Sequence, residues 1–392
     1  MPTAPDTIAL IMPPAEMDPH GTLRFATGIY GAAFEAIGRR TELFELSARD
    51  AGMIEALRSP RIEAVFSDGG WIHATQVAFG DTSGPARSLG DLVGKPSIVL
   101  ISDSPYNQWM DPILGRGRAN QTTVFIDPDF AAQWGRWADE VGAHQTYVPA
   151  CPDLGAAPPE SERSIGILVV ASTRPPDFHR ARALGRLTGD GVARLFDSLA
   201  EACLADGLRP FSAICDEALR SLDLRLDHKS STARFLLCSV EQFVRNRRRL
   251  IMLERLADHP ITLVGGGTIP RLHPDSRVME PMPYPRLVEC YRRARCVVVS
   301  PPYSGAITER LIHPMAAGAV VVAPPTSLGD RVLGRDRLYV TARADFADLG
   351  ACLDRALDPK SRKDMADAAL AEARRRFSPV ATVRRFLGEP DG

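Results

Sequence analysis

The sequence predicts an α/β protein made of two Rossmann-like domains that face each other across a cleft. Its 392 residues exceed what a single hydrophobic core usually serves. Short apolar runs of strand length alternate with helical segments in both halves of the chain. The clearest unit, residues 296–325, reads as strand, loop, helix and strand, which is the pattern of a parallel β-α-β crossover.

The first domain, predicted over residues 1–155, has the strand and helix alternation of a doubly wound parallel sheet. The segment from about Phe25 to Arg39 is expected to form the helix after the first strand. The expected strands are Thr7–Met12, Thr41–Leu46, Ala64–Ser67, Ser97–Ser102, Thr122–Ile126 and Gln145–Val148.

Residues 150–164 are polar and rich in proline, which favours a linker between domains. The second domain, predicted over residues 156–376, begins with a strand and continues in a mostly helical region to about residue 257. Its expected strands are Ile165–Ala171, Ile261–Val264, Arg277–Glu280, Cys296–Ser300, Ala319–Ala323 and Leu338–Val340. Residues 377–392 are expected to form a tail helix that packs back on the first domain.

Composition argues against several functional classes. The net charge of −1 gives no overall field that would attract nucleic acid or an anionic membrane. Seven scattered cysteines without a Cys-x-x-Cys pair indicate reduced thiols in a cytoplasmic protein. The N-terminus lacks the basic start and apolar core of a signal peptide, and no apolar run is long enough for a transmembrane segment.

Three glycines, Gly265, Gly266 and Gly267, directly follow a predicted strand of the second domain. A turn without Cβ atoms lets bare backbone approach a diphosphate. The same residues also suit a flexible turn from strand to loop. Their place after a strand, where open α/β sheets bind ligands, keeps both interpretations open.

The crossover loop carries Tyr303, Ser304, Gly305 and Ala306 immediately before a helix predicted over Ala306–Ala317. Free amides at a helix start, together with the Ser304 hydroxyl, can bind phosphate oxygens, and the helix dipole favours the negative charge. Ser304 is equally suited to cap the helix. The two roles are compatible.

Glu309 and His313 are four residues apart, so they share one face of that helix and are candidates to bind a ribose. Alternatively, Glu309 compensates the helix dipole and His313 is a half-buried histidine with satisfied hydrogen bonds. Arg310 would neutralise a diphosphate or pair with an acid such as Asp330. Arg174, at the end of a strand, is a further candidate to reach an anionic donor.

In the first domain, the acceptor-side candidates lie in loops at strand ends. They are His20, Gly21, Thr22, Gly70 and Asp103. Asp103 directly follows an apolar strand, where it would hydrogen-bond an acceptor hydroxyl or act as a base. The alternative is an Asx turn before Pro105.

Two other patterns favour ordinary structural roles. Asp127-Pro-Asp129 is similar to the Asp-x-Asp metal site of another transferase class, but its proline favours a solvated turn, and we predict no metal site. The basic runs are expected to be solvated helix surface rather than nucleic-acid or membrane contacts, and the alternative is that one of them contacts a phosphate-bearing acceptor. They are Arg245–Arg249, Tyr291–Arg295 and Arg374–Arg376.

Five segments carry a family resemblance. The second half contains RNRRRLIMLERLADHPITLVGGG (245–267), PMPYPRLVECYRRARCVVVSP (281–301) and YSGAITERLIHPMAAGAVVVAP (303–324), and the first half contains SDSPY (102–106) and TYVPACPD (146–153). In these segments the chain resembles group-1 glycosyltransferases with the GT-B fold, most closely the CgeB-like subgroup. The resemblance implies retaining, metal-independent transfer from a nucleotide-diphosphate sugar, with no cofactor.

One departure from the family pattern concerns two glutamates that stand eight residues apart. Here Gly305 is at the first place and His313 at the second, and Glu309 is our proposed substitute. The carboxylates expected to act in catalysis are then Asp103 and Glu309. The acceptor, a protein, a glycan or a lipid-linked saccharide, is left open. Two other hypotheses are a catalytically silent relative that binds a nucleotide sugar or a partner protein, and a nucleotide-sugar epimerase on the same fold.

Overall fold

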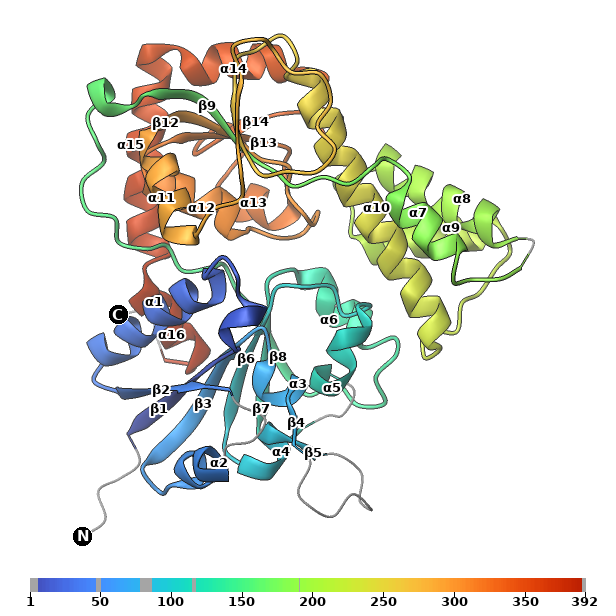
Figure 1. Ribbon diagram of the computed structural model, residues 1–392, viewed down its shortest axis with the longest axis vertical. Coiled ribbons are helices and arrows are strands. Elements are labelled where there is room, and N and C mark those ends of the chain that lie inside the picture. The colour runs from blue at the N-terminus through green and yellow to red at the C-terminus, as the bar shows by residue number, and fades with distance from the viewer. Residues whose placement is uncertain (1–5, 47–50, 78–86, 115–117, 190, 390–392) are drawn as a thin grey trace. The chain divides into compact units, whose positions relative to one another are not determined.

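The computed structural model describes residues 6–46, 51–77, 87–114, 118–189 and 191–389. Two compact units make up the chain: Met1–Ala150 with Pro379–Gly392, and Cys151–Ser378. Each unit contains a six-stranded parallel sheet accompanied by helices (Figure 1).

This division falls at slightly different places from the boundaries predicted after residues 155 and 376. Residues 151–155 belong to the second unit. There Arg292 donates a hydrogen bond to the Leu154 carbonyl, and Arg374 donates one to the Gly155 carbonyl. The first part of the predicted linker is therefore bound to the second unit through its backbone, which its composition does not reveal.

The first unit has the strand order β2-β1-β3-β6-β7-β8. The strands are β1 (Thr7–Met12), β2 (Arg40–Glu45), β3 (Ile62–Asp68), β6 (Ser97–Ile101), β7 (Gln121–Phe125) and β8 (Ala143–Thr146). The helices are α1 (Thr22–Ala36), α2 (Ala51–Arg58), α3 (Trp71–Ala74), α4 (Leu89–Val93), α5 (Asp111–Leu114), α6 (Pro128–Trp134) and α16 (Pro379–Phe386). A short antiparallel pair, β4 (Gln76–Val77) and β5 (Arg87–Ser88), is separate from this sheet. β1 is buried along its whole length, as expected for an inner strand of a parallel sheet.

All six strands predicted for this unit are present, with bounds that differ by at most two residues. The predicted helix from Phe25 begins earlier, at Thr22. Gly21 takes a left-handed conformation (φ 66°), and the Asp18 carboxylate accepts a hydrogen bond from the Arg24 amide at 2.9 Å. This turn supplies an acceptor for a first-turn amide, so the helix starts there.

The C-terminal helix α16 packs into the core of the first unit. The Phe386 ring lies 5.8 Å from Tyr30, 6.2 Å from Phe66 and 5.8 Å from Tyr147, measured between ring centroids. Phe386 is 5% exposed. The last described helix of the chain thus completes a core whose strands come from its first 150 residues.

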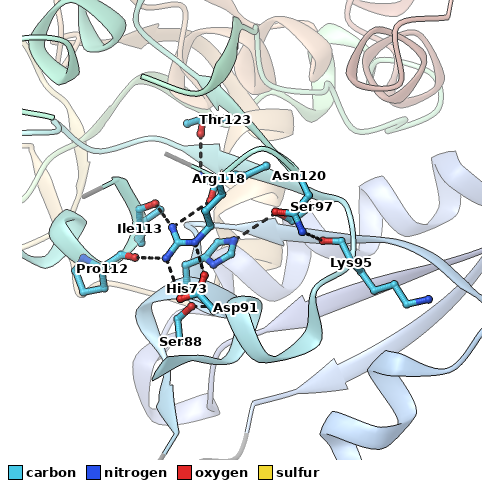
Figure 2. A network of polar contacts seen from close by, with 11 residues as sticks. His73, Ser88, Asp91, Lys95, Ser97, Pro112, Ile113, Arg118, Asn120 and Thr123 are labelled. Atoms are coloured by element: carbon cyan, nitrogen blue, oxygen red, sulfur yellow. Dashed lines mark hydrogen bonds and ion pairs between the residues drawn. The ribbon is translucent and has the colours of Figure 1, made fainter. Parts of the chain in front are cut away.

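Figure 2 shows a buried polar network in the first unit, centred on Arg118. Its Nε donates to Asp91 Oδ1 at 2.7 Å, and its Nη1 and Nη2 donate to the carbonyls of Ile113 and Pro112 at 2.9 and 3.1 Å. The Arg118 side chain is 9% exposed. A charge removed from water in this way needs a partner of opposite charge, which Asp91 supplies.

His73 lies beside this network and is 2% exposed. Its Nε2 is 3.4 Å from Ser97 Oγ, and its Nδ1 has no hydrogen-bond partner in the part of the chain that the structure describes. A Cβ on Gly90 would lie 2.1 Å from His73 Cε1, so a glycine is needed there to admit the ring. Burial, and then the charge of Arg118, lowers the pKa of His73 to about 3. The ring is therefore neutral at physiological pH.

The second unit has the strand order β11-β10-β9-β12-β13-β14. The strands are β9 (Ile165–Val170), β10 (Thr262–Val264), β11 (Arg277–Met279), β12 (Ala294–Val298), β13 (Val320–Ala323) and β14 (Val340–Thr341). The helices after β11 are α11 (Tyr284–Arg293), α12 (Glu309–Ala316), α13 (Ser327–Val332), α14 (Leu349–Leu357) and α15 (Pro359–Arg376).

Between β9 and β10 the described residues form four helices, which we call the helical arm. They are α7 (Phe178–Leu184), α8 (Val192–Ala205), α9 (Phe211–Ser221) and α10 (Ser231–Arg255). Figure 1 shows α7, α8 and α9 grouped around α10, away from the strands. The C-terminal part of α10 packs on the sheet through Met252 and Leu253. Among the described residues, no helix is both long and apolar enough to cross a membrane.

The predicted crossover is present as β12, α12 and β13, but its helix begins at Glu309 rather than at Ala306. The preceding loop is held by the backbone: the Ser327 amide donates to the Ser304 carbonyl at 2.9 Å. Thr308 occupies the N-cap position. The predicted capping role of Ser304 is therefore wrong, because Ser304 lies four residues before that position and its hydroxyl donates to the Arg209 carbonyl at 2.8 Å.

A buried arginine, Arg163, caps the C-terminal ends of two helices in the second unit. Arg163 is 7% exposed and donates to the carbonyls of Ala294 and Ala317 at 2.6 and 3.1 Å. These carbonyls follow the last residues of α11 and α12, where backbone acceptors lack helical partners. Gly318 (φ 75°) leaves room for this contact, since a Cβ there would lie 2.7 Å from Arg163 Nη2.

Candidate functional site

The three predicted glycines form a turn after β10 that packs on the loop after β9. Gly265 and Gly267 have φ angles of 149° and 98°. A Cβ would lie 1.8 Å from the Ala171 carbonyl oxygen at Gly265 and 1.9 Å from the Thr173 carbonyl oxygen at Gly267. Gly266 has nothing within 4 Å of its Cβ position. Two of the glycines therefore allow close backbone packing, and the middle one faces open space.

Helix α10 holds the same β9 loop from another side. The buried Asn246 side chain accepts a hydrogen bond from the Arg174 amide at 2.8 Å and donates one to the Arg174 carbonyl at 3.0 Å. Arg249 Nη1 donates to the Ser172 carbonyl at 3.0 Å. Positions three apart on a helix share a face, so Asn246 and Arg249 act on the loop together. Residues 172–174 are fixed between α10 and the glycine turn.

A cavity of about 460 Å³ opens at this point in the second unit. It lies at the carboxyl ends of β9 and β10, where open α/β sheets bind ligands. Its lining comes from the β9 loop, α7, α10, the glycine turn and the loop after β11. It includes Arg174, His179, Asn246, Arg249, Gly266 and Glu280. The predicted residues Arg174, Gly266 and Gly267 thus share one cavity.

Positive charge is concentrated around this cavity. Burial, followed by repulsion from Arg310 and Arg245, lowers the pKa of Arg249 to about 9. Burial, followed by repulsion from Arg182 and Arg174, lowers the pKa of His179 to about 4. Cations that repel one another are stabilised when an anion binds between them. The cavity is therefore suited to an anionic group.

The crossover loop contacts α10 through Tyr303. Tyr303 is 6% exposed, and its hydroxyl accepts a hydrogen bond from Arg245 Nη1 at 3.1 Å. The guanidinium carbon of Arg245 lies 4.7 Å from the centre of the Tyr303 ring. Ala306 is fully buried, and Ser304, Gly305 and Ala306 are not among the residues that line the cavity.

Glu309 and Arg310 begin α12 and are half-exposed. Glu309 Oε1 lies 3.7 Å from Arg310 Nε. The predicted alternative partner of Arg310 is engaged elsewhere, because Asp330 pairs with Arg335 at 2.7 Å. The charge of Arg310 lowers the pKa of Arg249, which lines the cavity.

His313 lies on the same helix but is buried, with 5% exposure. Its Nδ1 shares a hydrogen bond of 2.6 Å with the Tyr284 hydroxyl. The two rings pack edge to face with their centroids 5.7 Å apart. His313 is not among the cavity-lining residues, and this environment agrees with the alternative that its hydrogen bonds are satisfied inside the protein.

In the first unit, the acceptor-side candidates follow β1, β3 and β6, which are neighbours in the sheet. Their loops therefore lie at one sheet edge. His20 is exposed, and Thr22 is the first residue of α1. Gly70 has a φ of 70°, and a Cβ there would lie 2.8 Å from Ile113 Cδ1. Asp103 is half-buried in the loop after β6.

Asp127 and Asp129 form a helix start rather than a solvated turn, so that prediction was wrong. Asp127 is 2% exposed, and its Oδ1 accepts a hydrogen bond from the Asp129 amide at 2.8 Å, which caps α6. Across the described ranges, no group of three or more His, Cys, Asp or Glu residues is placed to hold a metal ion.

Sequence reasoning missed eight of the residues that line the cavity: Ser172, Thr173, His179, Gln242, Asn246, Arg249, Glu280 and Pro281. The basic run Arg245–Arg249 was expected to be solvated helix surface, which was wrong. Arg249 lines the cavity, and Arg248 donates to the Cys203 carbonyl at 2.6 Å. One pattern could have identified Asn246 and Arg249: they are three residues apart, and so share a face, on a helix that precedes a glycine turn.

Residues 245–388 match the family model for glycosyl transferase-like proteins. No curated protein matches the chain by sequence. The sucrose-phosphate synthase of Thermosynechococcus elongatus has a similar structure, with a TM-score of 0.54, 13% identity and coverage of 98% of each chain. The fold is that of GT-B glycosyltransferases.

A second GT-B structure, an alpha-glucosyltransferase in complex with UDP-glucose and DNA, matches with a TM-score of 0.53 and 10% identity, covering 97% of this chain and 98% of that one. TarM is longer: the match covers 83% of this chain and 54% of TarM, with 9% identity and a TM-score of 0.43. The predicted fold class is thus confirmed as GT-B. The cleft between the domains and the CgeB-like subgroup stay predictions.

Proposed function

We propose that the protein is a glycosyltransferase whose donor, a nucleotide-diphosphate sugar, binds in the cavity of the second unit. The observation that carries this proposal is the combination of cationic side chains with an open glycine turn at the carboxyl ends of β9 and β10. The match to glycosyl transferase-like proteins begins at Arg245 and includes Arg249, the glycine turn and Glu309. The cavity volume of about 460 Å³ falls within the range of small-molecule sites.

The diphosphate is assigned to Arg174, Arg249 and the backbone near Gly266. Guanidinium groups bind phosphate oxygens through charge-assisted hydrogen bonds. In transfer, negative charge grows on the departing nucleoside diphosphate, and fixed cations stabilise that charge without reorganisation. Tyr303 contributes indirectly by holding Arg245, which adds to the positive field.

Glu309 is our candidate for a ribose hydroxyl or for a role in catalysis, because it stands at the start of α12 beside Arg310. The acceptor side is assigned to the loops that carry His20, Gly21, Thr22, Gly70 and Asp103. There Asp103 would hydrogen-bond the acceptor hydroxyl or accept its proton. Retention of configuration and independence from metal ions and cofactors are part of the proposal through the family resemblance.

One observation favours a second candidate, a silent relative that binds a nucleotide sugar without transfer. His313 stands where the family pattern has a glutamate, and it is buried against Tyr284. In that case binding would be measurable and turnover would not.

The test is to incubate the protein with UDP-, GDP- and TDP-sugars and a mixture of acceptors, and to measure free nucleoside diphosphate. UDP-glucose is the first donor to use, because the alpha-glucosyltransferase of similar fold was solved with it. That complex also contains DNA, so duplex DNA is included beside protein, glycan and lipid-linked acceptors.

Arg249→Ala should weaken donor binding by about tenfold to a hundredfold, the value of a hydrogen bond to a charged group. Arg220→Ala, an exposed arginine on α9, is the control and should bind normally. Binding without release of product would favour the silent relative. Failure of every nucleotide sugar to bind would exclude both.

A further inference from the structure

The proposed donor cavity contains a histidine, His179, that the sequence analysis did not identify as a candidate. His179 is the second residue of α7, is half-buried, and lines the cavity with Arg174 and Arg249. Its ring packs edge to face on Phe178, with centroids 5.1 Å apart and an interplanar angle of 89°. Phe178 also lies under Arg174, whose guanidinium carbon is 5.5 Å from the ring centre. Phe178 therefore orders both cavity residues.

The charges around His179 come from every element packed near it. Arg182 lies one turn later on α7, Arg174 is in the β9 loop, and Arg245 and Arg249 are on α10. All four repel a protonated imidazole, and with burial they lower the pKa of His179 to about 4. The acids nearby are Asp177, the N-cap of α7, and Glu280 in the cavity lining.

The ring has no hydrogen-bond partner within the described part of the chain, so it is available to a ligand. A diphosphate in this cavity would bring negative charge into a place where positive charge now dominates. An anion within about 4–6 Å favours protonated histidine and raises its pKa by about 1–3 units. Protonation of His179 is therefore unfavourable without a bound anion and becomes more favourable when the diphosphate is bound.

We propose that His179 is a proton-linked ligand of the donor: it is neutral in the empty cavity and, in mildly acidic solution, takes up a proton when the diphosphate binds. This inference rests on the proposed donor site. The protonated ring then donates a hydrogen bond to a phosphate oxygen and acts as a further cation beside Arg174 and Arg249. No bond of the donor is broken in this step, and the proton comes from solvent.

The proposal predicts that donor affinity rises as pH falls. If the bound anion raises the pKa of His179 by about two units, affinity should increase about tenfold between pH 7 and pH 5. UDP-glucose is the probe, with GDP-mannose and TDP-glucose in parallel. In these compounds each phosphate carries one ionisable group of low pKa, so the ligand itself does not titrate in this range, unlike a phosphate monoester with a second pKa of about 6.

The experiment is calorimetric titration of the full chain with each probe at pH 5, 6 and 7, in two buffers that differ in ionisation enthalpy. Proton uptake below pH 7 and the rise in affinity are the expected results. His179→Gln keeps a polar side chain but cannot titrate, so its affinity should be independent of pH. His179→Lys carries a permanent charge and should bind at pH 7 as tightly as at pH 5.

His259→Gln is the matched control, since His259 is half-buried in the second unit and is not among the cavity-lining residues. It should keep the pH dependence of the unchanged protein. Thermal unfolding without ligand shows whether each variant is folded. Binding without proton uptake, or a pH dependence that survives in His179→Gln, overturns this inference and leaves the donor site in place. Failure of all three nucleotide sugars to bind overturns the donor site and this inference with it.

Discussion

Asn246 and Arg174 exchange two hydrogen bonds, in which the Asn246 side chain accepts from the Arg174 amide at 2.8 Å and donates to the Arg174 carbonyl at 3.0 Å. A single side chain thus satisfies both backbone groups of a residue in a loop between a strand and a helix. Asn246 is 3% exposed, so these bonds form away from competing water. Helix α10 of the arm therefore fixes the Arg174 backbone, from which the guanidinium extends.

Asn246→Ala should weaken both stability and donor binding. The substitution removes both hydrogen bonds to the part-buried Arg174 backbone, which costs about 1–3 kcal/mol in the free energy of unfolding. Donor affinity should fall about tenfold, because Arg174 loses its fixed position while keeping its charge. Denaturant unfolding and calorimetric binding measure the two effects.

Asn120→Ala is the control for this substitution. Asn120 also donates a hydrogen bond to a carbonyl, that of Lys95, but at an exposed site. Equal losses in both variants would contradict the positioning role.

The glycine turn allows a comparison of three adjacent substitutions. Gly265→Ala and Gly267→Ala place a Cβ within 2 Å of a carbonyl oxygen and require a strained backbone, so each should cost more than about 2 kcal/mol in the free energy of unfolding. Gly266→Ala meets nothing within 4 Å and should change stability by less than about 0.5 kcal/mol. It should nevertheless weaken UDP-glucose binding, because the new methyl group projects into the open space that the ligand needs.

These glycine variants are compared by thermal unfolding and by titration with the nucleotide sugar. Folded Gly266→Ala that binds as well as the unchanged protein would show that the ligand does not approach this turn. Stable Gly265→Ala would show that the close approach to Ala171 can relax.

Much of the fold could be predicted because its strands are short apolar runs between turn residues. β1 and β13 are buried throughout, and such runs are visible without knowledge of the neighbours. The start of α12 could not be predicted in the same way. Local propensity permits a helix from Ala306, whereas the hydrogen bonds that hold residues 303–308 as a loop come from Ser327 and Leu328, which are distant in sequence.

A glycine turn after a strand could be recognised from the sequence, and Gly266 and Gly267 line the cavity. The close packing of Gly265 and Gly267 on the loop after β9 was not predicted. The candidate site was not predictable where the role depends on which face of a helix is covered. Arg249 sits in a basic run that resembles solvated surface, and its approach to the cavity follows from the packing of α10 between the sheet and the other helices of the arm. His179 gave no signal, since a lone histidine after Pro-Pro-Asp-Phe has no distinctive pattern.

Phe386→Ala should destabilise the first unit. The ring is 5% exposed and contacts Tyr30, Phe66 and Tyr147, so its removal leaves a cavity and costs about 3–5 kcal/mol. Phe178→Ala is the control, because Phe178 is 41% exposed and its loss should cost much less. Denaturant unfolding followed by circular dichroism measures the difference. A Phe386 variant as stable as the unchanged chain would show that α16 is not part of the core.

The stability of the first unit should depend on pH through His73. Its pKa is about 3 in the folded protein, because burial and the charge of Arg118 disfavour the imidazolium. In the unfolded chain the pKa is about 6.5. A folded pKa below the unfolded one means that the unfolded state binds the proton first. Stability is therefore full above about pH 6.5 and is lost as pH falls towards 3, by up to about 1.4 kcal/mol per pH unit.

Asp91 contributes in the same direction but at lower pH. Burial raises its pKa, yet the hydrogen bonds from Arg118 and Ser88 outweigh burial and lower the pKa to about 2, so its contribution is lost only below about pH 4. Between pH 6 and pH 4.5 the slope for the first unit thus reports mainly on His73, whereas His179 contributes to the slope for the second unit. His73→Gln removes the titrating group and should flatten the slope of unfolding free energy in this interval, although the variant is less stable at pH 7.

His144→Gln is the control, because His144 is an exposed histidine of the same unit, and it should leave the slope unchanged. An unchanged slope in His73→Gln would mean that His73 accepts the proton without unfolding, which the orphaned Nδ1 and the adjacent Arg118 oppose.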